Sequence, residues 1–371
     1  MELESAAPEM APVLPAFDGG AVTGLIPALV GGRAAPWMPA AVEGATSVVL
    51  LVLDGLGANE IDARPEILRE LSAMEGTRIT TVVPSTTSTA LTSIATGLAP
   101  AQHGVLGYRI LVDGEVLNVL RWQTESRHPP DPFIVQRHDA FLGRPVPVIT
   151  RVEFRESGFS QAHLRGSTFV GWKTVATLIE HCKRLVAGGE KFVYAYYPGV
   201  DEVAHAYGLH DGFYERELAA ADALVGSLLD VLPAEAALLV TADHGQVHLE
   251  PESWIEINEL HPMLTAQAGD GRFRYLYARK GMAPDLLAAA RAQLGDVAWV
   301  LSRKEILEAG WLGAGATGTI PGRLGDVVLA ARDDVAFVDP ALPRERTLRS
   351  AHGSLTPQEM WVPLRAARGR A

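Results

Sequence analysis

The sequence predicts an α/β fold, a three-layer α/β/α sandwich built around a mostly parallel central sheet. Continuous apolar runs such as Val48–Leu53 and Ala236–Val240 have the composition of parallel strands that are buried on both faces. Amphipathic segments alternate with these runs along the chain. Such an alternation is typical of a parallel sheet with helices on both faces.

The first half of the chain contains four predicted strands and two predicted helices. Gly97 is the residue type that most often ends a helix, and Asp113-Gly114 is a hairpin signal. Pro147 cannot donate to a ladder, so its strand is expected at a sheet edge. In order we expect strand Val48–Leu53, a helix near Asn59–Ser72, strand Ile79–Val83, a helix from Thr87 to Gly97, and strands Tyr108–Val112 and Val146–Thr150.

The second half continues the alternation. Gly212–Leu232 is the clearest helix, because its leucines at 218, 224 and 228 share one stripe with Ala221 and Val231. The remaining predicted elements are helix Thr174–Leu185, strands Lys191–Tyr197 and Ala236–Val240, strand Phe273–Ala278, helices Pro284–Leu294 and Lys304–Ala309, and strand Asp326–Ala331.

The predicted domain organisation is simple. Residues 1–45 form a lead-in rich in Pro, Gly and Ala, which we expect to pack on the core with only short regular elements. Residues 46–371 are expected to form one domain, with cap-like insertions at about 104–165 and 247–345. A chain of 371 residues is long enough for such a core.

Six acidic or imidazole side chains lie in four short clusters. Asp201 and His205 are spaced i,i+4, which places both on one face of a helical turn. Other members follow predicted strands, where an open α/β sheet places its ligands. Each cluster alone has a structural explanation as a cap, a solvated face or a turn. Together, carboxylates and imidazoles are the ligands that zinc or manganese accepts. The six are Asp54, Asp201, His205, Asp243, His244 and His352.

Thr87 is a candidate nucleophile. It lies in a hydroxyl-rich segment, at the start of the helix that is expected to end at Gly97. Free amides and the positive dipole end favour a phosphate oxygen there, and a metal ion would lower the pKa of the hydroxyl. The alternative is an ordinary capping segment, in which any of Ser85, Thr86, Thr87 and Ser88 caps the helix.

The order of these motifs resembles the type I phosphodiesterase/nucleotide pyrophosphatase family, which belongs to the alkaline phosphatase superfamily. The resemblance runs from about residue 46 to residue 355 and so covers most of the chain. It rests on Asp54-Gly55, Pro84–Thr87, Thr96–Gly104, Pro198–Gly208, Asp243–Gly245 and His352-Gly353.

The resemblance implies an alkaline phosphatase-like fold with a lid over two divalent metal ions, zinc or alternatively manganese. One ion is implied to be held by Asp201, His205 and His352. The second is implied to be held by Asp54, Asp243 and His244, with Thr87 as the nucleophile facing it. The implied reaction passes through a covalent phosphothreonine.

Three functions remain open at this stage. The first is a phosphodiesterase or nucleotide pyrophosphatase acting on small molecules. The second is phosphomonoester or phosphonate hydrolysis on the same scaffold, or a phosphate transfer; it needs cations near the phosphate, for which the candidates are Arg109, Arg121, Arg151 and Arg155. The third is a non-catalytic binding relative. Ala90, one turn after Thr87, offers no side-chain donor and leaves the substrate class undecided.

Further side chains have both a functional and a structural interpretation. An aromatic ring could stack on a substrate, but such rings more often belong to the core; these are Tyr108, Trp122, Phe159 and Trp172. His103 is expected to be a structural turn residue. His210 and His248 are expected in exposed loops rather than beside the ligands.

Composition limits partners and location. A net charge of −12 opposes binding to a nucleic acid polymer, whereas a small phosphate ester remains possible. No apolar run approaches the roughly 20 residues of a membrane helix. Residues 1–8 lack the basic start and apolar core of a signal peptide, and Cys182 is the single cysteine. We therefore expect a cytoplasmic enzyme without a membrane partner; a signal ahead of residue 1 is the alternative, and the oligomeric state stays open.

Overall fold

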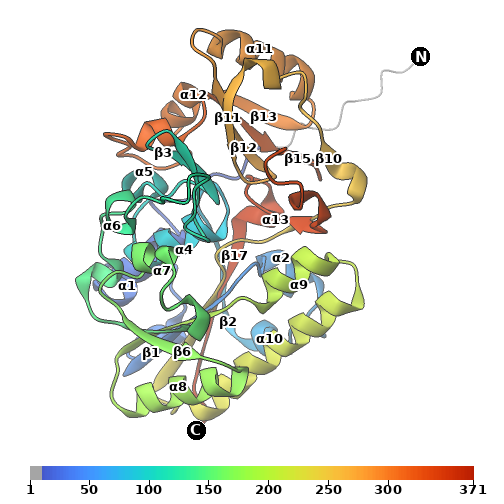
Figure 1. Ribbon diagram of the computed structural model, residues 1–371. Coiled ribbons are helices and arrows are strands. Elements are labelled where there is room, and N and C mark those ends of the chain that lie inside the picture. The colour runs from blue at the N-terminus through green and yellow to red at the C-terminus, as the bar shows by residue number, and fades with distance from the viewer. Residues whose placement is uncertain (1–10) are drawn as a thin grey trace.

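A seven-stranded sheet forms the centre of the computed structural model, which describes residues 11–371 (Figure 1). The five strands from β8 to β6 are parallel, while β17 is antiparallel to both of its neighbours. The predicted mostly parallel sheet is confirmed. In spatial order the strands are β2 (Glu75–Thr80), β17 (Trp361–Arg368), β8 (Ala236–Thr241), β1 (Ser47–Leu53), β7 (Phe192–Tyr197), β5 (Pro147–Arg151) and β6 (Thr168–Trp172).

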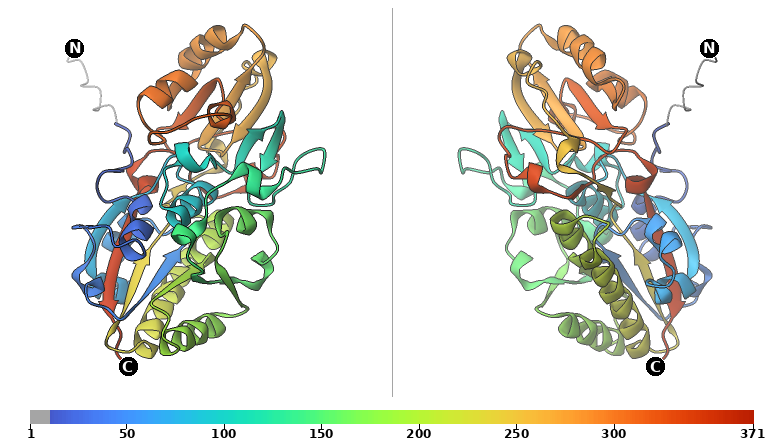
Figure 2. Two further views of the ribbon diagram at one scale, coloured as in Figure 1. Left: turned by 90° about the vertical axis from the view of Figure 1, so that its left-hand side faces the viewer. Right: turned by 90° about the vertical axis from the view of Figure 1, so that its right-hand side faces the viewer.

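Helices cover both faces of this sheet, because every residue of β1, β7 and β8 is buried and both faces therefore need apolar cover. On one side α10 packs against α8 and α3, and on the other α4 packs against α1 and α7 (Figure 2). The bounds are α3 (Arg69–Ala73), α8 (Val175–Ala187) and α10 (Gly212–Val231), then α1 (Leu25–Leu29), α4 (Thr87–Thr96) and α7 (Gly158–His163).

A second, four-stranded antiparallel sheet lies beyond the carboxyl ends of the main parallel strands (Figure 1). It has its own apolar core, in which Leu276 and Leu329 pack with Leu286 and Leu294. The whole unit lies within residues 247–345, whose role as a cap remains a prediction. Its elements are β11 (Leu264–Gly269), β12 (Phe273–Ala278), β13 (Ala298–Ser302), β14 (Val327–Ala331), α11 (Ala283–Leu294) and α12 (Arg303–Glu308).

The remaining short elements lie in the segments that link the main strands and helices. The predicted hairpin is present, with Asp113 and Gly114 both at positive φ as its two-residue turn requires. The short strands and helices are β3 (Arg109–Val112), β4 (Glu115–Asn118), β9 (Val247–His248), β10 (Trp254–Ile255), β15 (Ala336–Phe337), β16 (Ser350–Ala351), α2 (Ala58–Ala63), α5 (Pro100–His103), α6 (Pro132–Val135), α9 (Gly199–Tyr207) and α13 (Pro357–Met360). The 3₁₀ turns are Val22–Gly24, Ala40–Val42, Ala140–Gly143, Val152–Phe154, Pro251–Ser253, His261–Met263, Ile320–Arg323 and Glu345–Thr347.

Three sequence-based expectations were wrong. The helix expected near 59–72 is two helices, α2 and α3. Pro65 stands between them and has no backbone N–H to donate within a helix. The strand expected at 79–83 is β2, which runs from Glu75 to Thr80. It is an edge strand of the sheet, and its first four residues are exposed. Pro147 is not on an edge strand, since β5 lies between β7 and β6. Pro147 is instead the first residue of that strand, where a missing donor is tolerated.

The ends of the chain are described unequally. The expectation that there is no signal peptide rests on residues 1–8. These belong to residues 1–10, which lie outside the described residues. Val22, Leu25 and Ile26 of the predicted lead-in are buried against the main core. Within residues 11–371, no helix has the length and apolar character needed to cross a membrane.

Candidate active site

Three neighbouring strands bring the predicted ligands to one edge of the main sheet. Asp54 follows β1, and Asp243 and His244 follow β8, which pairs with β1 on one side. Asp201 and His205 lie on α9, which follows β7 on the other side of β1. Because the three strands are parallel, their carboxyl ends meet, as expected for ligand sites in open α/β sheets.

Asp201, His205 and His352 form one compact group. The Nε2 atoms of His205 and His352 lie 3.3 and 3.7 Å from Asp201 Oδ1. Their Nδ1 atoms lie 2.8 and 3.0 Å from the carbonyl oxygens of Ser350 and Ser85. These backbone contacts orient both rings so that Nε2 faces Asp201, which is how metal-ligating histidines are usually held.

Asp54, Asp243 and His244 form a second, fully buried group. His244 Nε2 lies 3.5 Å from both Asp54 Oδ1 and Asp243 Oδ2. The outer carboxylate oxygens are satisfied, because the Tyr196 hydroxyl donates to Asp54 Oδ2 and the Gly55 amide donates to Asp243 Oδ1 at 3.1 Å. Asp54 Oδ1 and Asp243 Oδ2 are buried and have no hydrogen-bond partner within residues 11–371. Two inward-facing oxygens without donors fit a bound cation.

Asp201 lies between the two groups. Besides its own group, one of its oxygens lies within 4.8 Å of ligand atoms of Asp54 and His244. Gln246 Nε2 donates to Asp201 Oδ1 at 2.9 Å. The sequence assigned Asp201 to one ion alone, whereas the structure places its carboxylate beside both groups.

Burial shifts the pKa values of Asp54, Asp243 and His352. Burial, followed by the charges of Asp243 and Asp201, raises the pKa of Asp54 well above its usual value. Burial also raises the pKa of Asp243. Burial and the nearby His244 and His205 rings lower the pKa of His352, so its imidazole is neutral and has a lone pair available for coordination. Buried carboxylates that lie this close together are favourable only when a proton or a cation offsets their charge.

Thr87 is the first residue of α4 and is 7% exposed. Its Oγ1 lies 3.1 Å from His244 Nε2, so the hydroxyl faces the group formed by Asp54, Asp243 and His244. This is the side on which the resemblance expects the nucleophile. Ala90 is buried within α4 and lines neither cavity described below.

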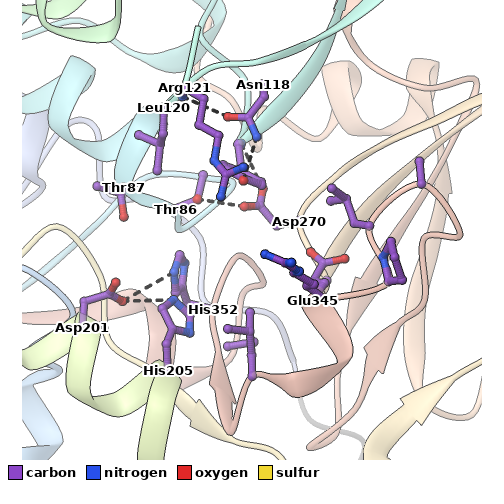
Figure 3. Close-up of a pocket in the computed structure, with 18 of the residues that line it drawn as sticks. Thr86, Thr87, Asn118, Leu120, Arg121, Asp201, His205, Asp270, Glu345 and His352 are labelled. Atoms are coloured by element: carbon purple, nitrogen blue, oxygen red, sulfur yellow. Dashed lines mark hydrogen bonds and ion pairs between the residues drawn. The ribbon is translucent and has the colours of Figure 1, made fainter. Parts of the chain in front are cut away.

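Two cavities meet at Thr87. The wider, about 630 Å³, includes Thr86, Asp201, His205 and His352 from the main domain and Asp270, Arg344 and Glu345 from the second sheet region (Figure 3). The narrower, about 220 Å³, is mostly apolar and is lined by residues such as Leu91, Phe154, Phe159, Leu164, Tyr194 and Tyr196. Thr87, Leu120 and Asp201 line both.

Of the four arginines considered from sequence, Arg121 alone lines either cavity. Its side chain points into the wider cavity and has no carboxylate partner among the described residues (Figure 3). The others have structural contacts: Arg109 pairs with Asp339, Arg151 pairs with Glu202, and Arg155 lies over the Phe169 ring.

The remaining candidates divide between core and cavity. Tyr108 lines the wider cavity and Phe159 the narrower one. Trp122 and Trp172 are buried and donate to backbone carbonyls. His103 is structural, as expected: its Nε2 lies 2.8 Å from Ser93 Oγ, and burial lowers its pKa to about 3. His210 and His248 contact each other with their rings tilted by 43°, away from both cavities.

Several cavity residues were not anticipated from the sequence. Asn118 and Leu120, at and just after the end of the hairpin, are two of them, and the only signal for them was the predicted turn at Asp113-Gly114. Asp270 reaches the cavity from the turn between β11 and β12. Its flanking glycines at 269 and 271 mark a turn but give no sign of its target.

Comparison with known proteins decides the family. The profile of the type I phosphodiesterase/nucleotide pyrophosphatase family matches residues 48–355. The chain belongs to this family. Its members are phosphoric ester hydrolases, so the predicted enzyme class is confirmed. No sequence among the curated proteins matches the chain.

Solved structures share the fold. Murine ectonucleotide pyrophosphatase/phosphodiesterase 5 aligns with a TM-score of 0.67 at 14% identity, covering 88% of each chain. An inactive variant of the murine protein in complex with AMP aligns at 0.64 and 14%, covering 86% of this chain and 87% of that one. Phosphonoacetate hydrolase from Sinorhizobium meliloti 1021, in complex with phosphonoformate, aligns at 0.62 and 19%, covering 97% and 94%. These similarities confirm the alkaline phosphatase-like α/β fold.

Proposed function

We propose that the protein is a metal-dependent hydrolase that cleaves phosphodiester or pyrophosphate bonds of small molecules, with Thr87 as nucleophile. One observation carries the proposal. Six ligand side chains from distant parts of the chain meet around Thr87, and two of their buried oxygens have no hydrogen-bond donor within residues 11–371. In the metal-dependent phosphoesterase family to which the chain belongs, this arrangement supports a two-metal site.

Asp201, His205 and His352 would hold one ion, and Asp54, Asp243 and His244 would hold the other, with Thr87 facing it. When bound, two divalent ions supply positive charge that stabilises the phosphate and lowers the pKa of a nearby hydroxyl. Zinc is proposed first because imidazole and carboxylate oxygens suit it, and manganese is the alternative.

The remaining roles belong to the chain itself. Thr87 Oγ1 forms a bond to phosphorus while the bond to the leaving alcohol oxygen breaks, which leaves a phosphothreonine. Water then cleaves the threonine ester and restores the hydroxyl. The α4 amides of Thr87, Ser88 and Thr89 have no acceptor within residues 11–371, so they are free to donate to a phosphoryl oxygen.

The two cavities favour a diester over a monoester. A diester carries two substituents, and the wide and narrow cavities offer a place for each on either side of Thr87. The narrow cavity is mostly apolar, so it suits an apolar or aromatic group. We therefore propose small-molecule diesters as the substrate class; the cytoplasmic location stays a prediction from sequence.

A second candidate is hydrolysis of a phosphonate or monoester. The observation that favours it is that Arg121 and Arg344 line the wide cavity without a carboxylate partner among the described residues. Two such guanidinium groups suit a terminal anion on the substrate.

A paired assay tests the proposal. Bis(p-nitrophenyl) phosphate and p-nitrophenyl phosphate are compared after chelation and after restoration with zinc or manganese. We expect faster turnover of the diester and recovery of activity with metal. Equal or faster turnover of the monoester would favour the second candidate, and no turnover of either would favour a binding protein.

The nucleophile is tested by Thr87→Ala. This variant should lose turnover by at least about three orders of magnitude, as expected when a covalent nucleophile is removed. It should still bind two metal ions by elemental analysis. Thr92→Ala is the matched control, because the Thr92 hydroxyl bonds to the Ser88 carbonyl of its own helix and reaches neither cavity. Near wild-type rates in Thr87→Ala would show that the nucleophile is another group.

A further inference from the structure

The residue that caps α4 does not cap it with its side chain. Thr86 is the N-cap and has extended backbone angles, φ −133° and ψ 147°, and such a threonine commonly accepts a hydrogen bond from an amide of the first turn. Here the Thr86 hydroxyl makes no such bond. It donates instead to Asp270 Oδ1 at 2.9 Å.

The first turn of α4 therefore keeps its donors free. The first amide of the helix with an acceptor is that of Ala90, which donates to the Thr86 carbonyl at 2.9 Å. The hydroxyls of Ser88 and Thr89 are also buried without a partner in residues 11–371. A packed helix end rarely leaves this many polar groups unsatisfied, so the turn is suited to an acceptor that arrives from outside.

Asp270 comes from a distant part of the chain. It lies in the turn between β11 and β12, is 6% exposed, and faces the wide cavity beside Thr86 (Figure 3). Its Oδ2 accepts from the Tyr108 amide at 3.3 Å. The nearby Arg274 pairs with Glu345 and Asp339. The Asp270 carboxylate thus contacts the nucleophile segment and the hairpin segment without an ion pair of its own.

We propose that Asp270 is a positioning residue for the reaction at Thr87. By accepting the Thr86 hydroxyl, Asp270 keeps that hydroxyl from turning to the α4 amides, so that these amides stay open to a phosphoryl oxygen. This inference rests on the proposed function, because it requires that the phosphate binds beside Thr87. It assigns a role in the reaction to a residue of the second sheet region.

A double-variant cycle tests this role, with kcat/KM for bis(p-nitrophenyl) phosphate as the measurement. In Asp270→Ala the Thr86 hydroxyl is free to cap α4, and a substrate must displace it. Since an N-cap bond is worth about 1 kcal/mol, kcat/KM should fall by about fivefold or more. In Asp270→Ala/Thr86→Val the competing hydroxyl is gone, and most of the lost activity should return.

A merely structural role predicts the opposite result. If Asp270 only supports the fold, removing the Thr86 hydroxyl as well deletes a second polar group and cannot restore activity. Absence of recovery in the double variant, with unchanged melting temperatures, would overturn the inference. Asp270→Asn is the conservative variant: its amide oxygen still accepts the Thr86 hydroxyl, so it should keep more activity than Asp270→Ala.

A binding measurement separates this inference from the proposed function. If the wild-type protein turns over no diester, the proposed function fails, but the cycle can still be followed by calorimetric titration with inorganic phosphate. Asp270→Ala should then weaken phosphate binding and the added Thr86→Val should restore it. If phosphate binds equally to all three proteins, the positioning role is wrong whatever the reaction.

Discussion

Hydrogen bonds hold the buried carboxylates of Asp54 and Asp243 in place. In each residue one oxygen accepts from a fixed donor, and the other faces inward and has no donor in the part of the chain that the structure describes. The donors hold the carboxylates in place, while burial raises both pKa values. Side chains arranged in this way cost stability in the absence of a cation, and they are pre-positioned to bind one.

The ionisation of Asp270 gives a pH-dependent prediction. Burial raises its pKa to about 6, above the value of about 3.9 in an unfolded chain. The folded state then binds the proton more tightly, so the stability this group contributes is present below about pH 4 and is lost as the pH rises through 6. Asp270→Asn does not ionise. The melting temperature of Asp270→Asn minus that of wild type should therefore become more positive from pH 4 to pH 7.

Thermal unfolding at pH 4.5 and 7.5 measures this difference. About two pKa units correspond to roughly 2–3 kcal/mol. Asp113→Asn is the control for the loss of one carboxylate, since Asp113 is an exposed turn residue. A constant difference for Asp270→Asn would contradict the prediction.

Arg121 gives a second prediction at this scale. Its guanidinium group enters the wide cavity without a carboxylate partner among the described residues, so we expect it to attract an anionic substituent. Two phenyl phosphodiesters are compared, one with a carboxymethyl and one with a carbamoylmethyl substituent. Their kcat/KM ratio should fall about twofold to fivefold in Arg121→Gln, because an exposed charge contact is worth about 0.5–1 kcal/mol.

The two esters differ only in charge, so their ratio isolates the electrostatic contribution. In wild type, this kcat/KM ratio should also decline as the salt concentration is raised. Arg33→Gln is the control, because Arg33 is exposed and lines neither cavity. An unchanged kcat/KM ratio in Arg121→Gln would show that another residue recognises the anionic substituent.

At the scale of elements, the loop that carries His352 depends on a buried ion pair. Arg272, in the turn between β11 and β12, pairs with Glu359 at 2.8 Å, and both side chains are fully buried. Glu359 also accepts from the Ser354 amide at 2.9 Å, and its carbonyl accepts from the Gly245 amide at 2.9 Å. One residue therefore links the second sheet region to the segments that carry His352 and His244.

Glu359→Gln should destabilise the protein strongly. Removing one partner of a buried pair leaves an uncompensated charge, here that of Arg272, and costs about 3–5 kcal/mol. Denaturant unfolding measures the loss, and metal analysis should show weaker retention of the ion held by His352. Glu308→Gln is the matched control, because its pair with Lys304 is exposed and should contribute less than about 1 kcal/mol.

At the scale of the whole molecule, the proposed metal ions would join distant segments of the chain. The candidate ligands come from the ends of β1 and β8, from α9 and from the segment after β16, so a bound pair of ions would connect segments nearly 300 residues apart, from 54 to 352. Anything that binds only the folded state stabilises it by mass action.

Chelation should therefore lower the melting temperature, and zinc should restore it. For a ligand at about 1,000 times its dissociation constant, each site adds about 4 kcal/mol. Elemental analysis should find two ions per chain in wild type and close to one in Asp54→Ala. A melting temperature that is insensitive to chelation, with no metal bound, would contradict the two-ion proposal.

The secondary structure near the site was predictable because local signals mark it. The run Val48–Leu53 and the glycine at 97 mark β1 and the end of α4, and both predictions are confirmed. β17 was missed, since its sequence Trp361–Arg368 carries arginines and a proline that do not look like a central strand. It is stabilised by pairing with both β2 and β8, which no local pattern reveals.

The sequence by itself determined the family, the fold class and the set of candidate ligands. Most of the candidates follow a buried strand or lie on a helical turn, and the role of His352 is implied by the family resemblance. Only the tertiary structure decided that Asp201 stands beside both groups, that Arg121 reaches the wide cavity while Arg109 does not, and that Asp270 contacts Thr86. Those facts depend on contacts between segments that are distant in the chain. Periodicity and turn chemistry describe only neighbours in sequence, so they carry no information about such contacts.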